Sequence, residues 1–355
     1  MRITSLTVEP WTLPLLAPFQ IAQRTATSAN NVKVELVTEQ TTGLGACAPV
    51  FYVTGESVDS VVSAISGAAP TFVGLDGSDL PSLLAAAKAS CGTQPAALAG
   101  LELAIYDLWA KLNGTDMKKH FGGSIGSVVT DMTIPIVDAE TAERSARDLA
   151  ARGFDTLKVK VGDPNGLQAD LDRIDAVRRA SPKARLRIDA NQGFTPLGAI
   201  DFINRVAASD APIDFIEQPV VKTDFVGLKT VREQSPYPVF ADEACCTPEH
   251  ARALIDMNAV DGIVVKLMKS GLSGAIEILQ ICRDSGIKTM MGCMLESGIG
   301  IAAALAIGIG YDADLFDLDS HQLLAPVQGL SVPFACRDNL LVWQDGFHGW
   351  GTITG

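Results

Sequence analysis

Charged residues recur at nearly regular intervals through the second half of the chain, each at the end of a short apolar run. They are Lys158, Lys160, Asp189, Glu217, Asp242, Lys266 and Glu296, followed by Asp317 and Asp319. From Lys160 to Glu296 the successive spacings are 29, 28, 25, 24 and 30 residues, close to one strand and one helix each. Residues at the carboxyl ends of successive barrel strands meet on one face, so we expect a single site. Lysines carry protons and carboxylates bind hard cations, which indicates metal-assisted proton transfer.

Three of these carboxylates predict a metal site. Asp189, Glu217 and Asp242 end three consecutive strands and offer hard oxygen ligands from one side, as Mg²⁺ prefers. No histidine stands at these strand ends, and of the four histidines only His321 follows the last strand closely enough to reach the site. A single strand-end carboxylate is commonly a helix N-cap, but the order lysine, acid, acid, acid, lysine argues against that alternative.

Two lysines predict the acid and base. Strand alternation points Lys158 and Lys160 to the same side, and Lys266 lies four strands further on, so Lys160 and Lys266 should face each other across the barrel mouth. Free lysine has a pKa of about 10.4, which a neighbouring cation lowers. This arrangement suits 1,1-proton transfer at a carbon next to a carboxylate, through a metal-stabilised enediolate, and it also permits syn β-elimination or cycloisomerisation.

Eight strand-like runs alternating with amphipathic helices position these residues. The runs begin near residues 129, 156, 185, 213, 238, 262, 289 and 315. The fold class is therefore α/β, and a barrel is favoured over a doubly wound sheet because no glycine-rich phosphate loop follows the first run. Residues 1–122 read as an α+β unit with an irregular loop over residues 16–30, and the tail after residue 320 is expected to pack back on that unit.

Composition excludes several classes of function. The net charge of −13 opposes binding to nucleic acid or anionic membranes. The longest apolar run, residues 299–310, is far below the roughly 18 residues of a membrane span, and no signal peptide is evident, so we expect a cytoplasmic protein. The 7 cysteines lack metal-site spacing and are expected to be reduced; the adjacent Cys245 and Cys246 could form a redox pair but lack an electropositive setting.

The motifs KVKVG, RIDANQG, IEQP, ADE, VVKLMKSG and GCMLESGIG resemble those of the enolase superfamily, in its muconate-lactonising-enzyme-like subgroup. The resemblance implies a (β/α)₇β barrel over residues 123–320 and a capping domain built from residues 1–122 with the tail 321–355. It also implies Mg²⁺ at the three carboxylates, acid and base roles for the two facing lysines, and supporting roles for Asn191, Glu243 and Glu296. KSGLSG departs from the paired glycine common in the family.

Within the subgroup the chain is most similar to dipeptide epimerases. Asp317 and Asp319 in FDLDS are suited to the free α-ammonium of a dipeptide, and the resemblance also assigns Lys158 and Thr133 to substrate binding. Arg24 aligns with an arginine that meets the glutamate side chain in alanine–glutamate epimerases, so L-Ala-D/L-Glu is the expected substrate. The alternatives are other dipeptides, N-succinylamino acid racemase or o-succinylbenzoate synthase activity, or an inactive metal-binding homologue. A homo-oligomer is expected by resemblance alone.

Overall fold

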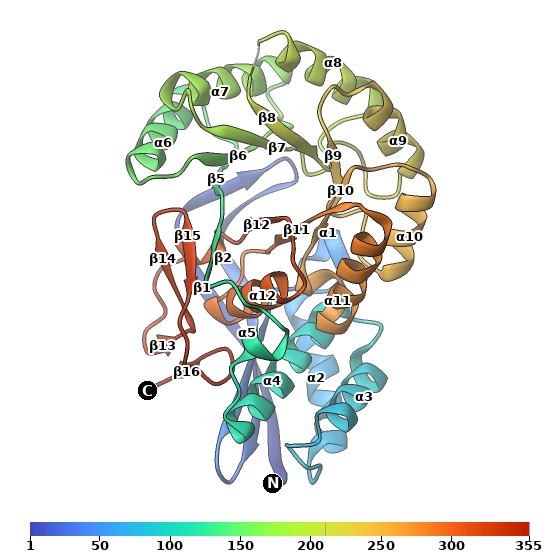
Figure 1. The fold of residues 1–355 in the computed structure, drawn as a ribbon, viewed down its shortest axis with the longest axis vertical. Helices are drawn as coiled ribbons and strands as arrows, with labels where there is room; N and C mark the ends of the chain where they lie inside the picture. The colour runs from blue at the N-terminus through green and yellow to red at the C-terminus, as the bar shows by residue number, and fades with distance from the viewer. Residues whose placement is uncertain (210, 355) are drawn as a thin grey trace.

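Eight parallel strands carry the charged residues described above and follow one another around a barrel in chain order (Figure 1). The computed structural model describes residues 1–209 and 211–354. The strands are β5 (Met132–Ile134), β6 (Thr156–Lys160), β7 (Arg185–Asp189), β8 (Ile213–Glu217), β9 (Val239–Ala241), β10 (Gly262–Val265), β11 (Lys288–Gly292) and β12 (Leu315–Asp317). Seven lie within the predicted runs and β11 begins one residue before its run, because buried parallel strands are short, continuous apolar stretches.

Seven helices connect these strands, which confirms the (β/α)₇β barrel. They are α6 (Ala139–Ala151), α7 (Leu167–Ala180), α8 (Pro196–Ala207), α9 (Phe225–Gln234), α10 (Pro248–Asp256), α11 (Leu267–Ser285) and α12 (Gly298–Gly310). Capping side chains begin several of them; Asp138, for example, accepts a 2.8 Å hydrogen bond from the Thr141 N–H. Figure 1 shows the first five of these helices in an arc outside the strands.

Helix α12 is buried on nearly every side, which explains its long apolar run. It packs against β11 of the barrel and also against the N-terminal unit, at β3 and α5. A helix that contacts protein all round needs no polar face. Within the described ranges 1–209 and 211–354, no helix has both the length and the hydropathy that a membrane span requires.

The N-terminal unit is an antiparallel sheet covered by helices. Its strands are β1 (Ile3–Ile21), β2 (Arg24–Thr38) and β3 (Thr42–Cys47), and its helices are α1 (Phe51–Thr54), α2 (Val58–Phe72), α3 (Leu80–Cys91), α4 (Pro95–Asn113) and α5 (Met117–His120). Helix α4 lies directly on β3, and a Cβ at Gly45 would come within 2.1 Å of the Gly100 carbonyl oxygen. Glycine is therefore required at this crossing. Helix α4 also packs on α11, which joins the unit to the barrel.

The predicted loop over residues 16–30 is wrong. Strand β1 continues to Ile21, the chain turns at residues 22–23, and β2 begins at Arg24, so this segment is the tip of a long hairpin. Alternation of apolar and polar residues is weak here because the tip leaves its own sheet and lies over the barrel mouth. There the Ile136 N–H donates to the Gln20 carbonyl oxygen at 2.8 Å, so backbone contacts replace an amphipathic pattern.

The tail contacts both other parts of the chain. Its elements are α13 (Ser320–Leu323), β13 (Leu330–Ser331), β14 (Phe334–Arg337), β15 (Leu340–Trp343) and β16 (Thr352–Ile353), and β15 pairs with β4 (Ser127–Val129) just ahead of the barrel. The Trp350 N–H donates to Asp107 Oδ1 on α4 at 2.6 Å, and its indole donates to the Leu103 carbonyl oxygen at 3.0 Å. The tail thereby fastens α4 in place.

Aromatic rings fill the barrel beneath the charged residues. Phe215 and Phe240 stack with ring centroids 4.2 Å apart and form a buried cluster with Val264 and Met290. A dry, close-packed floor excludes water below the strand ends and lowers the local dielectric. The charges above it are therefore expected to interact strongly.

Candidate active site

The two lysines of β6 point to the same side, as strand alternation predicts. Lys158 Nζ donates to Glu217 Oε1 at 2.9 Å and to Asp317 Oδ2 at 2.7 Å, and lies 3.0 Å from Asp189 Oδ2. Lys160, one step nearer the strand end, lies 2.5 Å from the same Asp189 oxygen. Lys158 is 1% exposed, so its charge is neutralised by three carboxylates rather than by water.

Asp189 and Glu217 are both fully buried but have different electrostatic settings. Burial disfavours the Asp189 carboxylate, but Lys158 and Lys160 outweigh that effect and hold its pKa below the usual value. Burial and the neighbouring Asp189 charge raise the pKa of Glu217 above its usual value. The ammonium groups of Lys158 and Lys160 therefore do not fully neutralise both carboxylates when Asp189 and Glu217 are ionised together.

Asp242, after β9, is held by two lysines. Lys266 Nζ and Lys269 Nζ each donate to one of its carboxylate oxygens at 2.7 Å. Burial opposes ionisation of Asp242, but these two ammonium groups keep its pKa below the usual value. Burial also disfavours the Lys266 ammonium, and the Asp242 carboxylate overcomes this and raises the Lys266 pKa.

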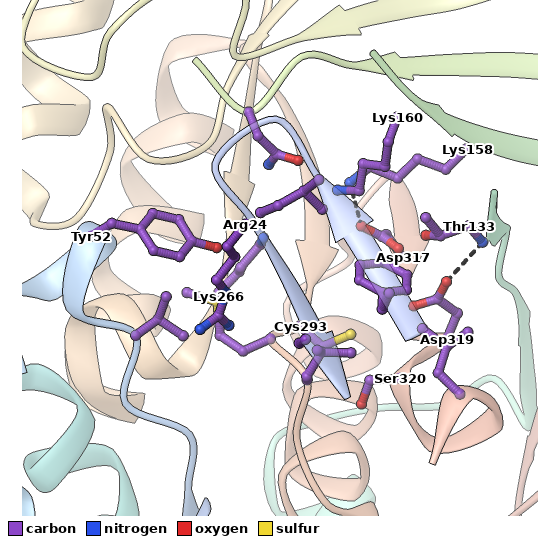
Figure 2. A pocket seen from close by; sticks show the side chains of 18 residues that line it. Arg24, Tyr52, Thr133, Lys158, Lys160, Lys266, Cys293, Asp317, Asp319 and Ser320 are labelled. Atoms are coloured by element: carbon purple, nitrogen blue, oxygen red, sulfur yellow. Dashed lines mark hydrogen bonds and ion pairs between the residues drawn. The ribbon is translucent and has the colours of Figure 1, made fainter. Parts of the chain in front are cut away.

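Lys160 and Lys266 approach one pocket from opposite sides (Figure 2). Lys160 ends β6, and Lys266 follows β10, four strands further around the barrel. A carbon atom held between them would have one amine on each face. This is the geometry that removal of a proton from one face and return to the other requires.

The residues around Asp189, Glu217 and Asp242 suit a divalent cation. Glu217 Oε2, Asn191 Oδ1 and Glu243 Oε2 are buried and have no hydrogen-bond partner. Unpartnered buried oxygens are costly, and carboxylate and amide oxygens are the donors that Mg²⁺ prefers. The donor set therefore fits a hard cation at this position.

Asp317 and Asp319 form the wall of the pocket beside β5. Asp317 accepts from Lys158, and Asp319 Oδ2 accepts from the Thr133 N–H at 2.8 Å. Burial opposes ionisation of Asp317, but Lys158 lowers its pKa to about 2, whereas burial and the Asp317 charge raise the pKa of Asp319 to about 6. This part of the pocket attracts a cationic group.

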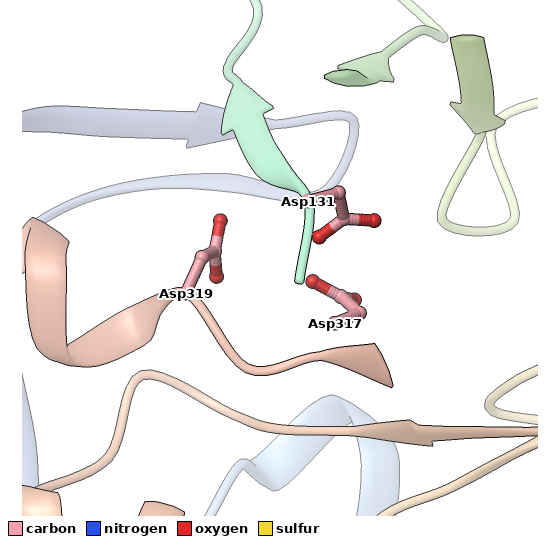
Figure 3. Close-up of side chains that lie close together, drawn as sticks. All are labelled: Asp131, Asp317 and Asp319. Carbon is pink, nitrogen blue, oxygen red and sulfur yellow. The ribbon is translucent and has the colours of Figure 1, made fainter. Parts of the chain in front are cut away.

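A second carboxylate cluster adjoins this wall. One oxygen from each of Asp131, Asp317 and Asp319 lies within 4.8 Å of the others (Figure 3). By spacing alone this cluster could hold a cation. However, Arg187 already lies 2.7 Å from Asp131 Oδ2, and Lys158 already binds Asp317. Two cations therefore occupy the cluster before any ion is added.

The hairpin tip closes the pocket from the N-terminal unit. Gln23 Nε2 donates to the Asn191 carbonyl oxygen at 3.1 Å. Next to it, the Ala22 methyl group lies over two glycines at the ends of β6 and β7. A Cβ at Gly162 would come within 2.9 Å of the Ala22 Cβ, and one at Gly193 within 3.3 Å. Glycine at both positions lets the tip approach the loops that follow Lys160 and Asp189.

Arg24 follows this turn directly and lines the pocket with Tyr52 of α1. The guanidinium carbon lies 5.2 Å from the centre of the Tyr52 ring, within the range of a cation–π contact. Burial raises the pKa of the Tyr52 hydroxyl to about 12, so it stays protonated at neutral pH. The N-terminal unit thus contributes one cation and one aromatic ring to the site.

The structure brings most of the predicted residues to this pocket. Its lining includes Arg24, Thr133, Lys158, Lys160, Asn191, Lys266, Asp317 and Asp319. The three predicted metal ligands lie immediately behind the lysines that contact them. The specific roles assigned to these residues stay predictions.

Besides the metal ligands, three further predicted residues lie outside this pocket: Glu243, Glu296 and His321. Glu243 faces a groove between the barrel and the N-terminal unit. Glu296 accepts from the Met294 N–H at 2.9 Å, and burial raises its pKa to about 7. His321 Nδ1 lies 3.0 Å from the Leu318 carbonyl oxygen, and its ring packs edge-on against Phe334, so it faces the tail.

Four residues of the site were not predicted: Tyr52, Asp131, Arg187 and Lys269. Two carried a detectable signal. Arg187 is two residues before Asp189 and Asp131 is two before Thr133, so strand alternation puts each on the inward face. Lys269 lies in the helix after β10, and Tyr52 comes from a separate unit, so no strand pattern marks either.

Comparison with known proteins gives consistent matches over nearly the whole chain. Residues 140–341 match the family model described as enolase C-terminal domain-like, and residues 2–122 match the mandelate racemase/muconate lactonizing enzyme N-terminal domain. The L-Ala-D/L-Glu epimerase of Thermotoga maritima is 33% identical over 86% of this chain and 89% of its own length. The hydrophobic dipeptide epimerase of Enterococcus faecalis is 35% identical over 86% of each chain. A crystal structure of the Enterococcus faecalis V583 dipeptide epimerase, complexed with Mg and L-Leu-L-Tyr, superposes with a TM-score of 0.90 at 32% identity, covering 99% of both chains.

Proposed function

The chain belongs to the enolase superfamily, within the mandelate racemase/muconate lactonizing enzyme family, and on that basis we propose that it is a Mg²⁺-dependent dipeptide epimerase. The reaction is inversion of the α-carbon of the C-terminal residue. The observation that carries the proposal is the placement of Lys160 and Lys266 on opposite sides of one pocket, with a carboxylate pair on its wall. An enzyme of this kind is an isomerase.

The two lysines act as base and acid in turn. One amine takes the α-proton from one face of the substrate, and the other ammonium returns a proton to the opposite face. Each lysine is now paired with a carboxylate, Lys160 with Asp189 and Lys266 with Asp242. Release of Lys266 from Asp242 would remove the contact that raises the Lys266 pKa, and the nearby cation Lys158 acts in the same direction, which favours an amine that can accept a proton.

Asp189, Glu217 and Asp242 would hold the Mg²⁺. Bound there, the ion would neutralise the negative charge that the substrate carboxylate gains as the α-proton leaves. The unpartnered oxygens of Glu217, Asn191 and Glu243 support this position over the cluster at Asp131, whose neighbours already include Arg187 and Lys158. Asn191, Glu243 and Glu296 are proposed to support the metal ligands and the lysines rather than to react.

Asp317 and Asp319 bind the free α-ammonium of the dipeptide, and Lys158 and Thr133 hold them in place. Lys158 donates to Asp317, and the Thr133 N–H donates to Asp319. The substrates of N-succinylamino acid racemases and o-succinylbenzoate synthases carry no ammonium, so an anionic wall disfavours them. This separates the proposed reaction from those of the same barrel family.

The C-terminal side chain meets Arg24, which supports glutamate at that position. A guanidinium pairs with a carboxylate through two parallel hydrogen bonds. A second candidate is a hydrophobic side chain, as in the Enterococcus faecalis relative. It is favoured by the contact of Arg24 with Tyr52 and by the apolar lining at Phe19, Ile21 and Leu323.

Proton NMR of an L-Xaa-L-Xaa library in D₂O tests the function. The protein and Mg²⁺ are incubated with each dipeptide, including L-Ala-L-Glu and L-Ala-L-Leu. Loss of the α-proton signal with appearance of the L,D epimer supports the proposal, and the order of rates identifies the side chain. Turnover of an N-succinylamino acid alone would instead assign the neighbouring activity.

We also propose a cytoplasmic location and a homo-oligomer. All seven cysteines are free thiols, which suits a reducing compartment. Leu197 and Val226 are 78% and 67% exposed on the outer helices, where a second copy could cover them. The molar mass in solution from light scattering tests the oligomer. The net charge of −13 supports the absence of nucleic acid and membrane partners.

A further inference from the structure

The barrel is closed at its seam by side chains that belong to the site. Strands β5 and β12 are the two ends of the hydrogen-bonded strand order. Between them the Leu318 N–H donates to Thr130 Oγ1 at 2.9 Å, and the Thr133 N–H donates to Asp319 Oδ2 at 2.8 Å. The segment that carries the two wall aspartates is therefore also the segment that closes the barrel.

Asp131 lies inside this seam and is fully buried. Arg187 Nη1 donates to Asp131 Oδ2 and, at 2.8 Å, to the Phe316 carbonyl oxygen. The other oxygen, Asp131 Oδ1, receives no hydrogen bond. The carboxyl groups of Asp317 and Asp319 lie close by (Figure 3). A buried oxygen without a donor, facing two other acceptors, is favourable only if it carries a proton itself.

The balance of charges in the cluster also indicates that Asp131 carries a proton. Three carboxyl groups meet here, and the two cations that contact them are Arg187 and Lys158. Lys158 also forms ion pairs with Asp189 and Glu217, so its charge does not neutralise this cluster alone. One proton removes the excess negative charge. Burial and the Asp317 charge raise the pKa of Asp131, and Asp319 adds to the effect, while Arg187 and Lys158 oppose it without reversing it.

We propose that Asp131 is a positioning residue of the ammonium site: fixed by Arg187 and neutral, it donates a hydrogen bond to Asp317 and orients that carboxylate toward the pocket. The inference rests on the proposed function only for the identity of the ligand, a primary ammonium. Because Asp131 is neutral, Asp317 and Asp319 supply the negative charge that meets the ammonium, and the wall does not need a metal ion.

Two substitutions separate this role from others. Asp131→Asn keeps a donor toward Asp317 and an acceptor for Arg187, whereas Asp131→Ala removes both. Asp214→Asn is the matched control, because Asp214 also lies beside Arg187, at 3.9 Å, but has no place in the seam. We expect Asp131→Asn and Asp214→Asn to keep the KM for a dipeptide within about threefold of the wild type, and Asp131→Ala to raise it by about tenfold or more with a smaller change in kcat.

A ligand without an ammonium excludes a merely structural effect. Inhibition by the corresponding N-acetyl dipeptide is expected to be equal in the wild type and Asp131→Ala, since that ligand does not use the wall. A KM increase in Asp131→Asn as large as in Asp131→Ala would overturn the proposal, because it would mean that Asp131 acts through a negative charge.

Infrared difference spectroscopy tests the proton without any activity. The wild-type minus Asp131→Asn spectrum at pH 7 should contain the carbonyl stretch of a protonated carboxyl group, shifted in D₂O. Its absence would overturn the proposal, as would a second Mg²⁺ per chain in equilibrium dialysis that is lost in Asp131→Asn. The infrared measurement does not need Asp131→Ala, so it can be made even if that variant fails to fold. It also separates failure of the inference from failure of the proposed function, which wild-type turnover tests.

Discussion

Lys266 and Lys269 donate to opposite oxygens of one carboxylate, that of Asp242, each at 2.7 Å. Their surroundings differ. Lys266 lines the pocket, whereas Lys269 is 1% exposed and also donates to the carbonyl oxygens of Asp242 and Val264 at 2.5 and 2.9 Å. Lys269 therefore fixes the carboxylate, and Lys266 is free to leave it when substrate arrives.

Replacing Lys269 with Met should destabilise the fold. It removes the buried ammonium that donates to Asp242 Oδ1 and to two carbonyl oxygens, while Lys266 still donates to Asp242 Oδ2, and we expect a loss of about 3 kcal/mol or more in the free energy of unfolding. Urea denaturation measures this loss. Lys229→Met, which removes an exposed pair with Glu233 at 3.7 Å, should change stability by less than about 0.5 kcal/mol. Equal effects of the two substitutions would contradict the fixing role.

Replacing either of the two lysines that face each other across the pocket should stop epimerisation. Lys160→Ala and Lys266→Ala are each expected to lower kcat by at least about 100-fold, because one face of the substrate loses its proton carrier. Each variant should still exchange the α-proton of one epimer with deuterium, followed by NMR, and the two should exchange opposite epimers. Full activity in either variant is incompatible with two-base proton transfer.

Replacing Arg24 should change substrate preference rather than chemistry. Arg24→Ala is expected to lower kcat/KM for L-Ala-L-Glu about tenfold more than for L-Ala-L-Leu, since only the former loses a charge-assisted pair. Arg152→Ala is the matched control, because Arg152 also lies 5.2 Å from an aromatic ring, that of Phe154, but does not line the pocket. Equal losses for both dipeptides in Arg24→Ala would favour the hydrophobic side chain.

Gly292 leaves room for the Lys266 side chain. A Cβ at Gly292 would come within 2.8 Å of Val264 Cγ1 and 3.1 Å of Lys266 Cε. Gly292→Ala should therefore displace the lysine and lower kcat by about 10- to 100-fold, while Mg²⁺ affinity measured by calorimetry stays unchanged. Gly126→Ala, where a Cβ meets open space, should have no effect. A wild-type kcat in Gly292→Ala would show that Lys266 tolerates the shift.

His321 should make stability fall in mild acid. Burial lowers its pKa to about 4, against about 6.5 in an unfolded chain, so the unfolded state binds the proton more strongly. The part of the free energy of unfolding that depends on neutral His321 is fully present above pH 6.5. It is lost as the pH falls toward 4, by at most about 3 kcal/mol. Urea midpoints across this range should vary less in His321→Gln than in the wild type. His348→Gln, at an exposed position, should follow the wild type.

The barrel and the charged strand ends were predictable because both follow from one periodic pattern. A buried parallel strand is a short apolar run, and its last inward residue lies at the mouth, so Lys160, Asp189 and Glu217 could be assigned to one face from spacing alone. The seven helices followed from the lengths of chain between the runs.

The parts that were missed depend on contacts between distant segments. The hairpin tip at Ala22 has little alternation because it rests on barrel glycines rather than on its own sheet. Tyr52 reaches the pocket only because its unit docks there. Asp131 and Arg187 could have been found by extending strand alternation one step inward, but their pairing joins β7 to the seam, and spacing does not reveal it.

The residues that anchor the hairpin tip to the barrel differ from the residues of the tip that line the pocket. Its anchors are the Gln20 carbonyl oxygen, the Gln23 amide and the Ala22 methyl group. Residues 19, 21, 24 and 26 line the pocket without serving as anchors. Substitutions at these four positions can therefore accumulate one at a time without removing an anchor of the tip or a charged residue of the barrel strands. Proteins with this architecture can therefore evolve a new substrate preference without passing through an inactive intermediate.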